Sequence, residues 1–83
     1  MSLISPFQND VEVATLDDLT IENTQVRIAF YGRIGLTRDK KGLDYARELR
    51  DLFNEVVRTL ESDKDLPEEV PDPVLEEAPN PFL

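Results

Sequence analysis

The chain of 83 residues contains no cysteine, no histidine and no tryptophan. Without cysteine there can be no disulfide, no thiolate catalysis, no thiolate zinc site and no iron–sulfur cluster. Without histidine as well, neither a Ser-His-Asp nor a Cys-His catalytic arrangement can be built. We therefore expect a protein that is not an enzyme and that holds no metal and no cofactor.

Acidic pairs are the remaining candidates for acid–base chemistry. They occur at Asp17-Asp18, at residues 68–69 and at residues 76–77. General acid–base catalysis needs carboxyl groups in an enclosed site that shifts their pKa values. These pairs fall in an expected turn or in a proline-rich segment, so we interpret them as solvated charge.

Basic residues are scarce, since nine Lys and Arg stand against 18 Asp and Glu. Residues 1–25 carry five acids and no base, residues 26–60 eight bases and five acids, and residues 61–83 eight acids and one base. A net-acidic chain is a poor candidate for binding nucleic acid or an anionic membrane. The middle third, however, is mildly basic.

Long apolar runs are also missing. No stretch approaches the roughly 18 apolar residues of a membrane-spanning helix. The first seven residues lack the positive start and the long apolar stretch of a secretory signal. The sequence thus predicts a cytoplasmic protein with no membrane contact.

Two regions alternate in the manner of β-strands. Residues 11–22 are partly alternating and are interrupted at Asp17-Asp18. Residues 23–25 predict a short turn, in which Asn23 would tolerate the left-handed conformation. Residues 26–34 form the clearest strand. One face would carry Val26, Ile28, Phe30 and Ile34, and the other Arg27, Ala29, Tyr31 and Arg33.

From about residue 39 to residue 61 the pattern predicts one long amphipathic helix, capped by Thr37 or Asp39. At ~100° per residue its apolar side chains fall in an arc of roughly 140°. These are Tyr45, Ala46, Leu49, Leu52, Phe53, Val56, Val57 and Leu60. We expect this arc to pack on the sheet. Because such a helix is longer than a typical strand, residues 56–60 are expected to reach a second subunit or the C-terminal segment.

The C-terminal segment, residues 63–83, is called the acidic tail below. From residue 66 it repeats in groups of four that open with an apolar residue, mostly continue with proline and mostly close with an acid. It is too proline-broken to be helical and too acidic to collapse. We predict a disordered tail that offers Leu66, Val70, Val74 and Phe82 to a protein partner.

The chain would then divide into a flexible N-terminal segment over residues 1–10, a body over residues 11–62 and the acidic tail. So small a body must bury nearly all of its apolar surface to offset the entropy of ordering the chain. Self-association as a homodimer, or docking of the termini through Phe7 and Phe82, would supply the missing burial.

A basic cluster lies where the last strand meets the helix: Arg33, Arg38, Lys40 and Lys41. Cations near a helix N-terminus oppose its dipole, whereas the exposed amides there attract anions. We treat the four residues as candidate ligands for phosphate, for a nucleic-acid backbone or for carboxylates. The acidic tail itself is one possible source of those carboxylates.

Two short patterns resemble known motifs. The glycines of residues 32–35 are similar to the GxxG loop of KH domains, but that loop joins two helices and here a strand meets a helix. Residues 80–82, Asn-Pro-Phe, resemble the short motif that EH domains bind. Three residues occur too often by chance to identify a partner. A ribbon-helix-helix protein would need two helices after its strand, and the pattern contains one.

Together these patterns predict an α+β fold: a small antiparallel sheet of two or three strands, one long amphipathic helix and a disordered C-terminal tail. They favour a small non-enzymatic interaction or regulatory protein that binds an unknown protein partner through its tail and helix surface. One alternative is an anion or nucleic-acid binder through the basic cluster, autoinhibited by the tail. Another is an acidic decoy that imitates nucleic acid.

Overall fold

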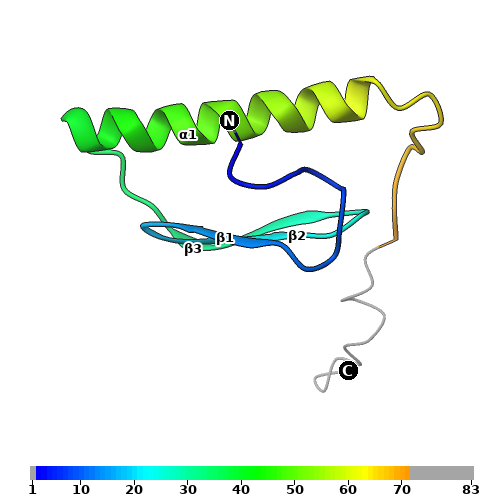
Figure 1. The fold of residues 1–83 in the computed structure, drawn as a ribbon, viewed down its shortest axis with the longest axis horizontal. Coiled ribbons are helices and arrows are strands. Elements are labelled where there is room, and N and C mark those ends of the chain that lie inside the picture. The colour runs from blue at the N-terminus through cyan, green and yellow to red at the C-terminus, as the bar shows by residue number, and fades with distance from the viewer. Residues whose placement is uncertain (1, 72–83) are drawn as a thin grey trace, which may run out of the picture.

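The computed structural model describes residues 2–71. It consists of three strands, β1 (Val13–Leu16), β2 (Asp18–Asn23) and β3 (Ile28–Arg33), followed by one helix, α1 (Lys40–Glu61). The strands form an antiparallel sheet in the order β1-β2-β3, and α1 lies across one face of it (Figure 1). The predicted α+β fold is confirmed. Residues 63–71 of the tail contain no helix or strand, and residues 72–83 lie outside the described part.

The β1–β2 hairpin turns at the predicted interruption. Leu16 pairs with Leu19, so that Asp17 and Asp18 form the connection. Asp17 has a φ of 57°, in the left-handed region that aspartate and asparagine enter more easily than other non-glycine residues. The acidic pair is therefore a turn element.

The β2–β3 hairpin differs from the prediction at Asn23. The Thr24 N–H donates to the Arg27 carbonyl at 2.8 Å, which leaves Gln25 and Val26 at the tip. Asn23, expected in a turn, is instead the last residue of β2 and is only 2% exposed. Its side-chain amide explains the difference, because it bonds to the N-terminal segment rather than to its own turn.

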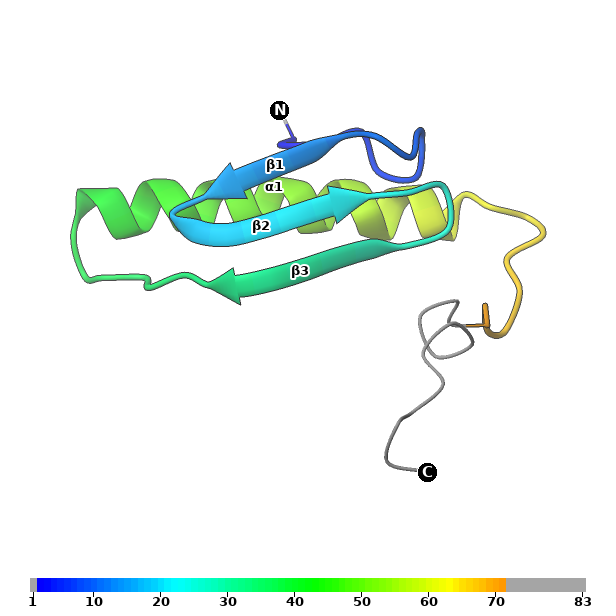
Figure 2. The ribbon, with the colours of Figure 1, turned by 90° about the horizontal axis from the view of Figure 1, so that it is seen from below.

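The strand alternation was predicted correctly for β3. Ile28 and Phe30 stand opposite Asn23 and Ile21 of β2, on the face that packs toward α1. Ala29, Tyr31 and Arg33 stand on the outer face. Among residues 2–71 no helix or strand covers that outer face (Figures 1 and 2).

The core is small and draws on the N-terminal segment. Ile4, Ile21 and Leu52 form the buried cluster, with Leu3, Ala14, Leu19, Ile28 and Val56 packed against it. Ile4 is 2% exposed although it precedes the predicted body, because it packs in one cluster with Ile21 of β2 and Leu52 of α1. The N-terminal segment that carries it runs beside β1 (Figure 2). Docking of a terminus thus supplies part of the burial that residues 11–62 lack.

A polar network fastens this segment to β2. The Ser5 N–H donates to Glu12 Oε1 at 2.8 Å, and the Phe7 N–H donates to Asn23 Oδ1 at 3.0 Å. Asn23 Nδ2 donates to the Ser5 carbonyl at 2.8 Å and to Glu12 Oε1 at 3.3 Å. The network holds Phe7 at a φ of 65°. It fixes the loop that places Ile4 in the core.

Glu12 should make the fold sensitive to acid. The Ser5 backbone N–H, with help from the Asn9 and Asn23 amides, holds the pKa of Glu12 below its ordinary value of 4.5. A carboxyl with a lowered folded pKa stabilises the fold above its unfolded pKa, and this stabilisation is lost as the pH falls through the folded pKa. In urea unfolding at a series of pH values, Glu12→Gln should therefore lose less stability below about pH 4.5 than the natural chain does. Equal acid sensitivity of Glu12→Gln and the natural chain would contradict this role of Glu12. Glu48→Gln, on the exposed side of α1, is the control and should respond to acid as the natural chain does.

The start of α1 depends on a close fit between a loop and the first turn. Asp39 caps the helix, as the sequence predicted: its Oδ1 accepts the Gly42 N–H at 2.8 Å and the Thr37 hydroxyl at 2.7 Å. Gly42 is buried because the Thr37 backbone passes directly over it. Across residues 2–71 no helix is both long and apolar enough to cross a membrane.

Candidate interaction site

The four residues of the predicted basic cluster come from three different parts of the structure. Arg33 stands opposite Asp18 on the outer face of the sheet, whereas Lys40 and Lys41 lie in the first turn of α1. Arg38 is exposed in the loop between them. Lys41 Nζ lies 5.8 Å from the centre of the Tyr45 ring, a cation–π contact. The four cations thus approach the junction from a strand, a loop and the first helical turn.

One amide at the start of α1, that of Gly42, already bonds a carboxylate of the chain's own, Asp39. The Gly42 N–H and the Thr37 hydroxyl, in that order, lower the pKa of Asp39 below its ordinary value, so that the carboxylate is favoured at the helix N-terminus. A phosphate at this position would have to displace that carboxylate. At the Gly42 amide, therefore, an external anion would compete with Asp39.

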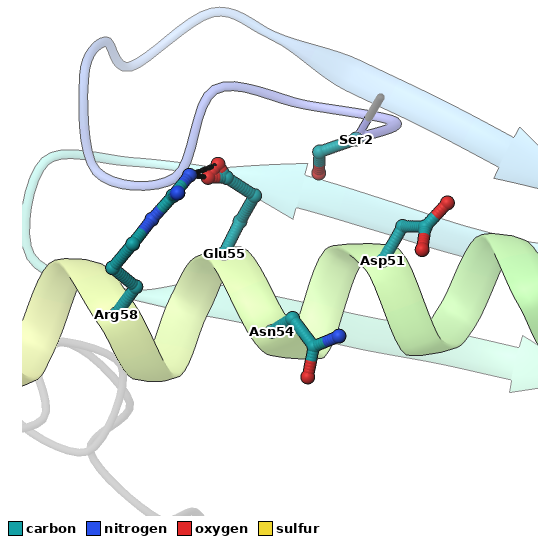
Figure 3. Close-up of a pocket in the computed structure, with 5 residues that line it drawn as sticks. All are labelled: Ser2, Asp51, Asn54, Glu55 and Arg58. Atoms are coloured by element: carbon teal, nitrogen blue, oxygen red, sulfur yellow. Dashed lines mark hydrogen bonds and ion pairs between the residues drawn. The ribbon is translucent and has the colours of Figure 1, made fainter.

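A polar hollow lies between α1 and the N-terminal segment. It measures about 330 Å³ and is lined by Ser2, Asp51, Asn54, Glu55 and Arg58 (Figure 3). Arg58 forms an ion pair with Glu55 one turn away. The side chains of Asp51 and Glu55 are each roughly a third exposed. The described residues contain no group of three or more side chains placed to hold a metal ion. We find no catalytic arrangement in this hollow.

A more apolar pocket of about 360 Å³ lies where the tail leaves α1. Its apolar lining comes from four parts of the chain: Phe7, Val26, Leu60, and Leu66 with Val70. Asp63, Glu68 and Glu69 lie on the same lining. We call this the tail pocket. Leu66 and Val70 remain 50% and 46% exposed there.

Two of the four predicted partner-binding residues therefore line one pocket, and Val74 and Phe82 lie outside the described residues. The sequence did not identify Phe7, Val26 and Leu60 as part of the same surface. Leu60, the last apolar residue of the helical arc, was the one residue of this surface that the sequence pointed to, since residues 56–60 were expected to reach a second subunit or the C-terminal segment. Phe7 was predicted only to dock on the body as a terminal anchor. Val26 had no local signal, because only the fold brings it to this end of α1.

A second apolar surface runs along the side of α1 that faces β3. Phe53 and Val57, one turn apart, are 49% and 52% exposed, and Phe30 of β3 is 40% exposed. The Phe30 and Phe53 rings meet with centres 5.9 Å apart at 49°. The buried part of the helix is thus narrower than its apolar arc. Viewed from the sheet side, α1 lies behind β1 and β2, while β3 forms the outer edge (Figure 2).

Comparison of the chain with models of protein families, with curated proteins and with solved structures gives no significant match.

Proposed function

We propose that the protein is a small non-enzymatic interaction protein that binds a protein partner through the tail pocket. The observation that carries this proposal is the joint lining of one pocket by the helix end, at Leu60, and the first two apolar residues of the repeat, Leu66 and Val70. Half-exposed leucine and valine around a hollow offer apolar area that a partner side chain can cover.

The charges around the pocket define the partner further. Asp63, Glu68 and Glu69 share its lining, and the nearest basic residue along this segment is the lone Lys64. Charge complementarity then favours a protein surface that presents a large apolar side chain between lysine or arginine residues. The apolar contact would supply affinity, and the acids would supply orientation and a fast encounter.

Selection from a random peptide-display library with the full chain as bait tests this function. We expect selected peptides to share a large apolar residue flanked by Lys or Arg. The double variant Leu66→Ser, Val70→Ser should bind them at least about 10-fold more weakly, since two apolar contacts are lost. The control Leu36→Ser changes an equally exposed leucine in the loop before α1 and should bind normally.

Two results would refute the proposal: no basic-apolar consensus, or equal binding by the double variant and the control. Binding that persists in the double variant but fails at moderate salt would indicate a purely electrostatic contact, as the decoy alternative requires. The anion-binding alternative has less support, because Asp39 already bonds the Gly42 amide and the four basic residues come from a strand, a loop and a helix.

A further inference from the structure

We infer that two copies of this chain pair through β3, antiparallel and about a twofold axis, to form a continuous six-stranded sheet. The inference goes beyond the proposed function, because it concerns a different surface and a different partner. It rests on the main chain of β3, on the uncovered apolar side of α1 and on the distribution of charge along the molecule.

The first observation is that, within residues 2–71, β3 is an edge strand with little of the usual protection. Natural sheet edges are commonly guarded by charged residues, proline or a bulge. From Ile28 to Gly32, β3 contains no charged residue and no proline. Within residues 2–71 its only strand neighbour is β2. The other edge, β1, has four residues and adjoins the N-terminal segment (Figure 2).

The second observation concerns the direction of the main-chain groups. Thr24 and Arg27 form a hydrogen-bonded pair in the β2–β3 hairpin. In an antiparallel ladder such pairs alternate with pairs whose main-chain groups point away from the neighbouring strand. Counted from Thr24 and Arg27, Ile28 and Phe30 belong to pairs of this second kind. Both residues therefore direct their N–H and C=O groups toward the free edge. An identical strand in antiparallel orientation can accept and donate the same bonds, with Phe30 opposite Phe30 of the second copy.

The third observation is the apolar surface above that edge. Phe53 of α1 meets the Phe30 ring of β3, and these two residues and Val57, one turn after Phe53, are each about half exposed. Pairing at β3 places the two Phe30 side chains next to each other on the face that carries both helices. The aromatic pair of Phe30 and Phe53 is then extended across the twofold axis, which adds the burial that a core of this size lacks.

The distribution of charge along the molecule favours a second copy of the chain, over another partner, at the β3 edge. The acidic side chains of the tail pocket lie at the C-terminal end of α1, and Arg38, Lys40 and Lys41 lie at its N-terminal end. A helix of this length separates the two ends by about 33 Å. Antiparallel pairing reverses one copy, so that the acidic end of each copy lies at the same end of the dimer as the basic end of the other. This register also places Arg27 opposite Arg33 of the other copy at each end of the new strand pair, and the acidic side chains gathered at the same ends offset that repulsion.

The mass of the full chain in solution is the primary test. Sedimentation or light scattering from micromolar to millimolar concentrations should show twice the chain mass, and added salt should weaken the association. A monomer mass throughout overturns the inference. If the full chain is monomeric but becomes dimeric when residues 72–83 are removed, the edge is covered by the chain's own tail, and the inference is equally overturned.

Matched variants locate the contact. Phe53→Lys should weaken association roughly 30-fold or more, as loss of a central aromatic contact does. Glu48→Lys introduces the same side chain at an exposed residue that lies nine positions before Val57, hence on the opposite side of α1 at ~100° per residue, and should leave the dimer intact. Equal effects of the two variants would contradict the inference. Circular dichroism confirms that each variant remains folded.

Single cysteines define the register, and the cysteine-free chain makes this test clean. Under mild oxidation Phe30→Cys should form a covalent dimer, because the two side chains meet at the twofold axis. Thr15→Cys, on the opposite edge, should not. Cross-linking from Thr15 and not from Phe30 would place the contact at β1 and overturn the inference. Neither test involves Leu66 or Val70, so that this inference and the proposed function can fail separately.

Discussion

Replacing Asn23 by aspartate is expected to lower the free energy of unfolding by roughly 3 kcal/mol at neutral pH, because it places a second carboxylate in a buried network. The two amide hydrogens that now bond to the Ser5 carbonyl and to Glu12 are lost. Urea unfolding measures the change. Since unfolding of small domains costs only about 5–15 kcal/mol, the variant would be near the limit of stability.

The pH dependence of the Asn23→Asp variant should be opposite to that of the natural chain. Contact between the introduced carboxyl and Glu12 would raise the pKa of one of the two above its unfolded value. Stability would then increase as the pH falls through that raised pKa, because the folded state binds more protons than the unfolded state. Asn54→Ala, on the exposed side of α1, should change stability little at any pH. If Asn23→Asp were as stable as the natural chain, the network would not hold the N-terminal segment.

Replacing Gly42 by alanine is expected to destabilise the protein by about 2–4 kcal/mol, through overpacking and loss of a helix cap. A Cβ at this position would meet the Thr37 backbone within 2.9 Å at three atoms. The loop that carries Asp39 would have to move, and the bond from Asp39 to the Gly42 N–H would be lost. Thermal and urea unfolding measure the loss.

The sign of this effect makes it informative. Within an ordinary helix, glycine to alanine stabilises by roughly 0.5–1 kcal/mol. Gly35→Ala is the control, since a Cβ there meets nothing within 4 Å, and its expected effect is small or stabilising. If Gly42→Ala were as stable as Gly35→Ala, the close passage of Thr37 over the first turn would not be a feature of the protein in solution.

Local patterns predicted the elements of the fold but not how they fit together. Alternation in residues 26–34 identified the buried face of β3, and the acidic pair at residues 17–18 marked the first turn. The cap at Asp39 followed from residue type and position. These features depend on neighbours in the sequence. Asn23 was misassigned because its amide bonds to residues 16 to 18 positions earlier, a relationship that no local pattern contains.

The candidate site was predictable only where it follows the chain. Leu66 and Val70 were identified from the spacing of the tail, and they line the tail pocket. The basic cluster, in contrast, was grouped because its members are close in sequence. In the structure the pleat turns Arg33 to the outer face while Lys40 and Lys41 lie on α1. Proximity in sequence fails as a guide where the chain passes from a strand to a helix on another layer.

The position of Ile4 has a consequence for biosynthesis. Its neighbour Leu52 lies 48 positions later in the chain, so an emerging polypeptide holds Ile4 exposed until most of the protein has been made. Contacts between such distant positions form slowly, because a long loop must close before they stabilise anything. Residues near Ile4 are thus made before their native neighbours and are among the last to reach them. Until then the nascent chain carries an uncovered apolar segment that chaperones can recognise.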